Sequence, residues 1–479
     1  MITPDRMAAV DENAAALGVP RKQLMESSGN AVAAAVRRVA TPGARVALVC
    51  GRGNNGGDAF VAARFLDSYD PTVHLLGRPE SIATDIAREN WEALRTAEYD
   101  ARVVRDSRAL DLNDPDVIVD AMLGTGVTGA LRQPERDAAK RINASEATVV
   151  SVDVPSGIDA ATGEATGVAV DADRVITFHD MKPGLDGGDV TVADIGIPET
   201  AELFVGPGDR RPLSRPSDAH KGAFGEVLVV GGGPYTGAPA LAGQAAMRAG
   251  ADLVRVACPE SVAREVQAFE AGLIVRPFDG DRLTPEILDR VLSLAAGHDT
   301  VVVGPGLGDS GPTLSAIREF LTGYDGRAVV DADALEVVPE VDTDATLLCT
   351  PHAGELRAMG GPAVGDNDWR ERLNGVAEFA ADLGHTLLVK GAYDAVTDGE
   401  RRRVNRTGNP GMTVGGTGDV LAGAAGALLA TVGPLNAGGL AAYATGLAGD
   451  RVADREGHGL LASDLLDELP RALWGDRDE

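Results

Sequence analysis

The sequence predicts two α/β domains, each built on a parallel β-sheet that is covered by helices. Short runs of Val, Ile and Leu with the length of strands recur along the chain, each followed by a glycine loop and an Ala- and Leu-rich helical stretch. These apolar runs are continuous rather than alternating, as in strands buried on both faces. The length of 479 residues also exceeds what a single core usually organises.

The apolar runs place the strands in both halves of the chain. In the first half they lie at residues 45–50, 73–76, 117–120, 148–152 and 174–178. In the second half they include residues 227–230, 253–257, 300–303, 328–331, 346–349 and 387–390. Between the halves, residues 205–220 are rich in Pro and Arg and have no apolar periodicity, which is typical of a linker. We therefore expect domains at residues 1–210 and 218–475.

Composition restricts the class of protein. Hydrophobic residues at 44% and charged residues at 24% are ordinary for a folded globular chain. The net charge of −28 argues against nucleic acid or an anionic membrane as a partner, because both attract clusters of Lys and Arg. Cys50, Cys258 and Cys349 lie far apart and are expected to be buried thiols in a reducing compartment. The N-terminus lacks the pattern of a signal peptide, so we expect a cytoplasmic protein.

The acidic composition favours a high-salt cytoplasm. Only five of the 44 basic residues are lysines, and carboxylate-rich, lysine-poor surfaces suit such a compartment, although a GC-rich genome would also favour Arg over Lys. Salt screens the repulsion between surface carboxylates, so the hypothesis predicts that the melting temperature rises as KCl is raised from low to molar concentration. A melting temperature that stays level in that series contradicts it.

One uncharged stretch, residues 420–449, is long enough to span a bilayer. Its bulk is Ala and Gly, and Pro434 and Asn436 interrupt it. Two buried helices joined by a turn are therefore expected there, rather than a membrane span.

The first glycine loop, residues 51–58 (GRGNNGGD), follows the first strand and formally satisfies the dinucleotide pattern G-x-G-x-x-G. That pattern expects an acidic residue after the next strand, where this chain has Arg78. Since an arginine can accept a 2′-phosphate, an NADP-binding fold remains an alternative. Asn54 and Asn55 are more distinctive, because a plain phosphate loop does not need their amides. Turn chemistry is the competing explanation for the two asparagines.

Two further strand ends carry oxygen-bearing side chains. Asp120 precedes a loop at residues 124–129 (GTGVTG), and Asp153 precedes one at residues 154–159 (VPSGID). All three loops are expected to open at the carboxyl edge of one sheet, where α/β folds bind ligands. Asn55, Asp120 and Ser156 would then supply hard oxygens with a single formal charge, which suits a monovalent cation such as K⁺. Asp153 is left as the candidate proton carrier.

On the motifs at residues 54–58, 120–134 and 153–159, the first half resembles the YjeF N-terminal family, the NAD(P)HX epimerases. The similarity extends from residue 1 to about residue 205 and implies a Rossmann-like, three-layer parallel sheet. It implies that K⁺ is held by Asn55, Asp120 and Ser156. The residues it assigns to binding of hydrated NAD(P)H are Asn54, Asn55, Gly56, Gly57, Asp58, Gly124, Thr125, Gly126, Val127, Thr128, Gly129, Ala130 and Asp153. Ala59 departs from the family, whose members commonly have Gly at that position.

In the second half, residues 410–419 (PGMTVGGTGD) form the strongest motif. Glycines at positions 415, 416 and 418 free the backbone to turn its N–H groups toward one point, and the helical stretch that follows adds its dipole, so the loop predicts an anion site. Asp419 fits a base that deprotonates a hydroxyl next to a phosphoryl group, as in kinases. A helix N-terminal Asp is the alternative. Taken alone, the loop predicts a small-molecule kinase.

Other glycine-rich stretches and charged side chains accompany this motif. Residues 220–225 (HKGAFG) and 231–239 (GGGPYTGAP) flank one strand, and residues 304–308 (GPGLG) follow another. His352 stands with Glu355 after a third strand and is a candidate catalyst or a capped loop residue. Lys390 ends a strand and begins a KGAYD motif, and its ammonium can balance a nucleotide phosphate. A solvated lysine at a strand end is the alternative.

In this order the elements resemble the YjeF C-terminal family of the ribokinase-like fold, the ADP-dependent NAD(P)HX dehydratases, from about residue 220 to residue 469. The resemblance implies that NAD(P)HX contacts Ala238, Gly306, His352 and Asp419. It assigns ADP, with Mg²⁺, to Lys390, Gly391, Ala392, Tyr393, Asp394, Asn409, Gly415, Gly416, Thr417 and Gly418. Many relatives read Met-Ala-Thr before the paired glycines, where this chain has Met412, Thr413 and Val414.

Together the two resemblances imply a bifunctional enzyme of metabolite repair. Asp153 would serve epimerisation of (R)- and (S)-NAD(P)HX, and Asp419 would serve dehydration of the S epimer at the expense of ADP. NADHX and NADPHX would be the small-molecule partners, and a homo-oligomer is expected. Two rivals remain: an ATP-dependent vitamin-precursor kinase of the same fold, and a first half that has become a non-catalytic binding or scaffold module.

Overall fold

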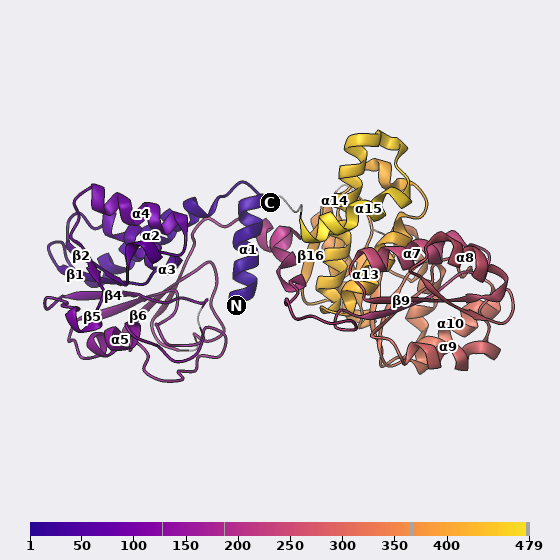
Figure 1. Ribbon diagram of the computed structural model, residues 1–479, viewed down its shortest axis with the longest axis horizontal. Helices are drawn as coiled ribbons and strands as arrows, with labels where there is room; N and C mark the ends of the chain where they lie inside the picture. Colours follow the sequence, from indigo (N-terminus) through magenta and orange to yellow (C-terminus); the bar gives the residue numbers. More distant parts are fainter. Residues whose placement is uncertain (127, 186, 364–367, 476–479) are drawn as a thin grey trace. The chain divides into compact units, whose positions relative to one another are not determined.

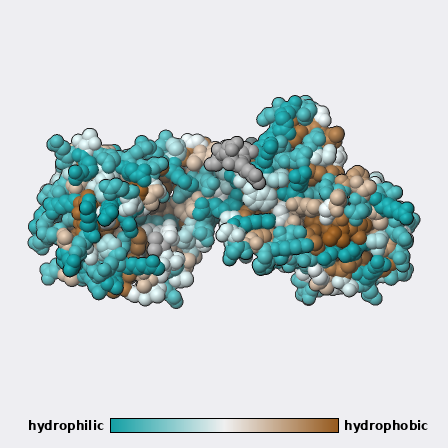
Figure 2. All heavy atoms as spheres, viewed as in Figure 1, coloured by the Kyte–Doolittle hydropathy of each residue, from teal (hydrophilic) through white to brown (hydrophobic). Residues whose placement is uncertain are grey.

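The computed structural model describes residues 1–126, 128–185, 187–363 and 368–475 (Figure 1). By its internal contacts the chain separates into two compact units, residues 1–201 and residues 202–479. Each unit is a central sheet flanked by helices, which confirms the two predicted α/β folds. Figure 2 shows hydrophilic residues over most of the visible face of each unit, as expected from the composition.

The first unit contains a seven-stranded parallel sheet with the strand order β3-β2-β1-β4-β5-β6-β7. Its strands are β1 Arg45–Cys50, β2 Asp70–Leu76, β3 Ala101–Val104, β4 Val117–Ala121, β5 Thr148–Val152, β6 Arg174–Phe178 and β7 Val190–Ala193. Its helices are α1 Pro4–Ala16, α2 Arg21–Val39, α3 Asn54–Arg64, α4 Asp85–Thr96, α5 Glu135–Asn143 and α6 Glu199–Leu203, with short 3₁₀ turns η1 Pro79–Ser81 and η2 Ser107–Ala109.

Alternate residues of β1 enter two different cores of this unit. Val46 and Leu48 pack with apolar side chains of α2, α3 and α4, whereas Ala47 and Val49 pack with α5. Both faces of the strand are therefore buried, which explains its continuous apolar sequence. Helices on each side of the sheet make three layers, as predicted for a Rossmann-like domain.

The second unit contains a nine-stranded sheet with the order β10-β9-β8-β11-β12-β13-β14-β15-β16, antiparallel only in its last two pairings. Its strands are β8 Glu226–Val230, β9 Leu253–Pro259, β10 Ile274–Phe278, β11 Thr300–Val303, β12 Arg327–Val330, β13 Thr346–Cys349, β14 Thr386–Val389, β15 Asp394–Thr397 and β16 Arg402–Asn405. One face packs mainly on α7 Gly237–Arg248, α13 Thr417–Leu429, α14 Pro434–Glu456 and α15 Ala462–Trp474. The other packs on α9 Leu288–Ala295, α10 Gly311–Gly323, α11 Ala353–Ala358 and α12 Trp369–Leu383.

The shorter elements of this unit are α8 Ala263–Phe269 and the 3₁₀ segments η3 Pro207–Leu213, η4 Glu260–Val262, η5 Pro285–Ile287, η6 Ala332–Glu340, η7 Pro410–Thr413 and η8 Gly457–Gly459. Residues 420–449 fall in α13 and α14, which are largely buried, so the expected helix pair is confirmed. Among the described residues, no helix is both long and apolar enough to cross a membrane. All three cysteines are buried free thiols, as predicted.

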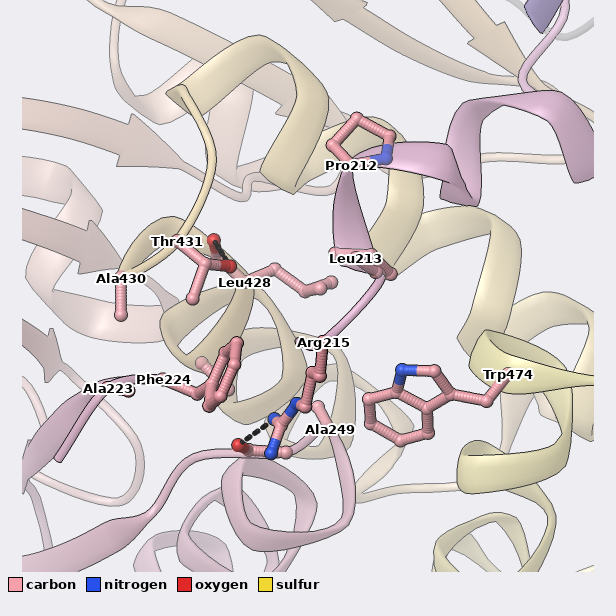
Figure 3. A pocket seen from close by; sticks show the side chains of 12 residues that line it. Pro212, Leu213, Arg215, Ala223, Phe224, Ala249, Leu428, Ala430, Thr431 and Trp474 are labelled. Atoms are coloured by element: carbon pink, nitrogen blue, oxygen red, sulfur yellow. Dashed lines mark hydrogen bonds between the residues drawn. The ribbon is translucent and has the colours of Figure 1, made fainter. Parts of the chain in front are cut away.

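The segment from Phe204 to Arg215, which overlaps the stretch with linker-like sequence, packs on the rest of the second unit. Phe204 forms a β-bridge with Val404, and Asp209 makes an ion pair with Arg403 at 2.7 Å, where both side chains are about nine-tenths buried. The Arg215 guanidinium lies 3.9 Å from the Phe224 ring centre and donates a hydrogen bond to the Gly250 carbonyl at 2.5 Å (Figure 3). We call residues 204–215 the strap.

Candidate active sites at the carboxyl edges of the two sheets

In the first unit, the loops after β1 and β4 and the start of α3 are in close contact. A side chain at Gly51 would begin 1.8 Å from the Met122 carbonyl oxygen, and one at Gly56 would begin 2.2 Å from the Gly51 oxygen. Both positions therefore require glycine. The close packing brings Asn55, at the start of α3, to the edge where Asp120 ends β4.

Asp120 is fully buried and hydrogen-bonded to the loop after β5. Its carboxylate accepts the Ser156 hydroxyl at 2.7 Å, the Ser156 amide at 2.9 Å and the Ser151 hydroxyl at 2.9 Å. Burial raises the pKa of Asp120, and the hydrogen bonds from Ser156 and Ser151 only partly oppose that effect. The predicted pairing of Asp120 with Ser156 at one sheet edge is thus present as a direct contact.

Asn55 and Asp153 face the next loop, at Gly124. A side chain there would begin 3.4 Å from Asn55 Cγ and 3.4 Å from Asp153 Oδ2. The preceding Leu123 donates its amide to the Ser156 hydroxyl at 3.0 Å, which links this pair to Asp120. Asn55 is 9% exposed, and neither polar atom of its amide has a hydrogen-bond partner in the described part of the chain. Because a buried, unpaired amide destabilises a fold by about 1–3 kcal/mol, this one fits a ligand-binding role better than turn chemistry.

Asp153 is held in an unusual backbone conformation beside a buried lysine. Its φ of 65° lies in the left-handed region, which a residue other than glycine adopts only when the surroundings fix it. Lys182 Nζ lies 3.2 Å from Asp153 Oδ1, and the Lys182 side chain is 1% exposed. We did not expect Lys182 at this site.

Two further carboxylates, those of Asp58 and Asp11, interact electrostatically with Asp153 or Lys182. Burial raises the pKa of Asp58 well above its usual value, and Asp153 and Asp11 add to the effect. Burial likewise raises the pKa of Asp11 to about 6, against the opposing charges of Arg21 and Lys182. Asp58 therefore keeps a proton to higher pH than an ordinary aspartic acid, and it can donate a hydrogen bond.

The other predicted residues of the first unit lie around this centre. Asn54 is exposed, and its side-chain oxygen accepts the Thr84 hydroxyl at 2.8 Å. Gly124 and Gly129 help to line a cavity together with Pro155, Gly157, Ile158 and Asp159 of the neighbouring loop. Thr125, Gly126, Thr128 and Ala130 belong to the same partly exposed loop, and Val127 lies outside the described residues. Gly57 is buried in α3, and Ala59 is fully buried in the core, away from the loops.

In the second unit, a lysine joins three consecutive strand ends. Lys390, after β14, lies 3.0 Å from Asp331 Oδ1, after β12, and 3.6 Å from Glu355 Oε2. The hydroxyl of Thr350, after β13, donates to the same Asp331 oxygen at 2.7 Å. Burial alone would lower the pKa of Lys390, but the Asp331 and Glu355 carboxylates outweigh burial and raise it. Lys390 is thus a fixed ammonium rather than a solvated strand-end lysine.

The glycine loop meets this ammonium at the N-terminus of α13. A side chain at Gly418 would begin 3.5 Å from Lys390 Nζ, and Gly416 has φ 99°, which favours glycine. Asp419 stands in the first turn of the helix. Burial and the nearby Asp331 raise the pKa of Asp419 to about 7, and Lys390 offsets part of that effect. A carboxylate that is half protonated at neutral pH is suited to accept a proton from a substrate hydroxyl.

The residues predicted to contact the hydrated cofactor lie on neighbouring loops of this edge. Gly306 has φ 72°, and a side chain there would begin 2.9 Å from the Tyr235 carbonyl oxygen and 3.2 Å from Ala238 Cβ. His352 is exposed and caps α11, where its Nδ1 accepts the amides of Gly354 and Glu355 at 2.9 and 3.1 Å. An isolated parallel β-bridge pairs the backbones of His352 and Lys390.

Several predicted nucleotide ligands use their side chains to shape the loops. Asp394 accepts the Gly391 amide at 2.9 Å and the Asn405 amide group at 2.9 Å. Asn409 caps η7 and donates to Asp450 at 3.0 Å. Thr417 donates its hydroxyl to carbonyl oxygens of the preceding loop. Gly391 and Ala392 are exposed, and the half-buried Tyr393 stacks on Trp369 with ring centres 6.0 Å apart.

Comparison with known proteins identifies a family for each unit. Residues 21–184 match the family described as YjeF-related protein N-terminus, and residues 227–471 match the family described as NAD(P)H-hydrate dehydratase. A protein of Methanothermobacter thermautotrophicus, described as bifunctional NAD(P)H-hydrate repair enzyme Nnr, is 43% identical over 99% of this chain and 95% of its own length. The chain belongs to the family of bifunctional NAD(P)H-hydrate repair enzymes.

Other members of this repair-enzyme family and one solved structure are also similar. The Pyrobaculum aerophilum protein of the same description is 44% identical over 98% of both chains. The ADP/ATP-dependent NAD(P)H-hydrate dehydratase of Bacillus subtilis, co-crystallized with ATP and Mg²⁺, is 26% identical over 55% of this chain and 95% of that one, with a TM-score of 0.47.

Three charged residues that lie at the two candidate sites of this repair-enzyme chain were not predicted as site residues from the sequence. Asp331 ends a predicted strand, as Asp120 does, so the rule that ligands bind at carboxyl ends of parallel strands could have found it. Glu355 was noted beside His352 but was not assigned to the site. Lys182 follows the predicted strand at residues 174–178, yet no local pattern shows that it is buried.

Proposed function

We propose that the protein repairs hydrated NADH and NADPH with one site in each unit. The first site interconverts (R)- and (S)-NAD(P)HX, and the second dehydrates the S epimer at the expense of ADP, giving NAD(P)H, AMP and phosphate. One structural observation supports this division most directly. In each unit an aspartate suited to proton transfer lies near a largely buried lysine, Asp153 with Lys182 and Asp419 with Lys390.

In the second unit, dehydration begins at the C6 hydroxyl of the hydrated nicotinamide ring. Asp419 accepts the hydroxyl proton while the oxygen attacks the β-phosphorus of ADP, and the bond from that phosphorus to the bridging oxygen breaks to release AMP. The C6–O bond of the resulting phosphate ester then breaks, and phosphate leaves with the electrons of that bond. Loss of a proton from C5 restores the C5–C6 double bond. Hydroxide is a poor leaving group, so phosphorylation turns it into a good one.

The nucleotide would lie between Lys390 and the N-terminus of α13. The ammonium and the helix dipole both favour the negative charge of a diphosphate. We assign Mg²⁺ to the diphosphate oxygens, since it keeps most of its shell as water and phosphate and needs few protein ligands.

In the first unit, epimerisation requires the C6 centre to open and close. Asp153 accepts the hydroxyl proton as the C=O bond forms and the C6–N1 bond breaks, with its electrons passing to N1. Rotation of the resulting aldehyde exposes its other face. Return of the electrons from N1 and of the proton from Asp153 closes the ring with the opposite configuration, so no co-reactant is consumed.

We assign K⁺ to Asn55, Asp120 and Ser156 in the first unit. The unpaired, buried amide of Asn55 and the single carboxylate of Asp120 offer oxygen ligands with low total charge, which fits a monovalent cation. The ion would supply positive charge beside the substrate's diphosphate. Epimerisation is expected to be slower in Na⁺ than in K⁺ at equal ionic strength. Equal rates in the two salts would contradict the assignment.

The function is tested by incubating the protein with both NADHX epimers and either ADP or ATP while NADH absorbance is followed. Complete conversion with ADP requires both activities, whereas conversion of the S fraction alone shows only the second. A kinase would instead consume ATP and accumulate a stable phosphorylated product. Cytoplasmic location and homo-oligomeric assembly remain predictions, which cell fractionation and light scattering would check.

The pKa of Asp419 predicts how dehydration depends on pH. The base must be ionised to accept the hydroxyl proton, and with a pKa of about 7 it is half protonated at neutral pH. The value of kcat/KM for (S)-NADHX is therefore expected to fall about tenfold per pH unit below pH 7 and to level off above it. Initial rates with limiting (S)-NADHX and constant ADP measure the profile. A level profile through neutral pH would show that Asp419 is not the base.

A further inference from the structure

Lys182 in the first unit is fixed by two hydrogen bonds and an ion pair. Its Nζ lies 2.7 Å from the Phe178 carbonyl oxygen, 3.2 Å from the Asp180 carbonyl oxygen and 3.2 Å from Asp153 Oδ1. Two of the three N–H donors of the ammonium are thus used in hydrogen bonds to carbonyl oxygens, and its charge is paired with the Asp153 carboxylate. With its side chain only 1% exposed, Lys182 has almost no surface that a substrate could touch.

The two carboxylate oxygens of Asp153 have different surroundings. Oδ1 is beside Lys182 and also accepts the Thr177 hydroxyl at 3.1 Å. Oδ2 faces Gly124, where a side chain would begin 3.4 Å away. One oxygen is thus held by the protein, and the other faces a loop that lines the cavity.

The backbone fixes the carboxylate from the other end. Asp153 has φ 65°, and its amide donates to the Ile176 carbonyl oxygen at 2.7 Å. A left-handed residue other than glycine carries strain of about 1–3 kcal/mol, which the surrounding structure must offset. Anchors on the backbone and on Oδ1 together leave the side chain little freedom to rotate.

We propose that Lys182 is a positioning residue for epimerisation, which holds Asp153 Oδ1 and so makes Oδ2 the oxygen that exchanges the proton with the C6 hydroxyl. The inference rests on the proposed epimerase function of the first unit. Oδ2 takes the proton as the ring opens and returns it as the ring closes. The positive charge of Lys182 also acts on the neighbouring Asp11, together with that of Arg21.

Lys182→Met tests the proposal, because it nearly keeps the length of the side chain and removes the ammonium. We expect kcat for epimerisation to fall about 10- to 100-fold with an unchanged KM, since Lys182 does not touch the substrate. Lys182→Arg keeps the charge and is expected to recover part of kcat. Lys140→Met, at an exposed position in α5 of the same unit, is the matched control and should behave as wild type. Dehydration of (S)-NADHX by the second unit should stay constant throughout.

Several results would overturn the proposal. A wild-type kcat in Lys182→Met would do so, and so would equal losses in the Met and Arg variants accompanied by a raised KM. If Lys182→Met does not fold, Thr177→Val decides, because it removes the hydrogen bond to Oδ1 and keeps the lysine. For Thr177→Val we expect a 3- to 10-fold lower kcat at constant KM, which is about the effect of one hydrogen bond. An unchanged kcat would refute the claim that epimerisation requires Asp153 Oδ1 to be held. Absence of epimerisation in the wild-type protein would instead refute the proposed function.

Discussion

Asp419→Asn is expected to lower ADP-dependent dehydration by roughly 10²–10⁴-fold, the usual contribution of a positioned general base. Asparagine has nearly the same shape, but it cannot accept the C6 hydroxyl proton. Burial and the nearby Asp331 raise the pKa of Asp419 to about 7, so the carboxylate has the basicity that this step needs at neutral pH. Initial rates of NADH formation from (S)-NADHX measure the effect.

The same variant also tests the division of labour between the two units. Epimerisation should continue unchanged in Asp419→Asn, which chromatography of the two epimers would show. Asp467→Asn is a suitable control, because Asp467 is 79% exposed in α15 and its ion pair with Arg248 contributes little. Equal loss of both activities in Asp419→Asn would refute two independent sites.

Asp153→Asn is expected to lower epimerisation by a similar factor, roughly 10²–10⁴-fold, because an amide cannot cycle the C6 hydroxyl proton. With both epimers and excess ADP, rapid NADH formation should then stop once the S fraction is used. The R fraction should react further only as fast as it epimerises spontaneously. Reaction progress curves with (R)-NADHX alone measure this remaining rate.

A matched control for the first unit is Asp114→Asn, whose carboxylate is 97% exposed. It should give complete conversion at the wild-type rate. If Asp153→Asn also gave complete conversion at that rate, the proton carrier would have to be another group. Asp58 would be the next candidate, since its raised pKa shows that it retains a proton near this site.

Much of the fold could be predicted because central strands buried on both faces need continuous apolar sequence. The predicted run at residues 45–50 is β1, and the run at residues 300–303 is β11. The missed strands lie at or near sheet edges. β3 and β10 are short and lack a continuous buried run, since each has two adjacent exposed positions, and β15 and β16 form an antiparallel hairpin after the last parallel strand.

The candidate sites were predictable where chain geometry requires a residue type. Gly51 and Gly56 contact backbone so closely that no side chain fits, and Asp120 is the last residue but one of β4, at the carboxyl edge of the sheet. Lys182 was not predictable, because its burial depends on packing between distant elements. The loop-shaping hydrogen bonds of Asp394 and Asn409 were not predictable either, since their partners Asn405 and Asp450 lie elsewhere in the sequence.

The strap limits how the two activities can be separated by cloning. Neither family match includes residues 204–215, so a dehydratase expressed from residue 227 would lack Asp209 and leave the buried Arg403 without its carboxylate. Loss of one partner from a buried ion pair destabilises a fold by about 3–5 kcal/mol, a large part of an ordinary domain's stability. An expression boundary at residue 202 keeps that pair, and it also keeps the ring contacts of Phe204 with Trp369 and Tyr393.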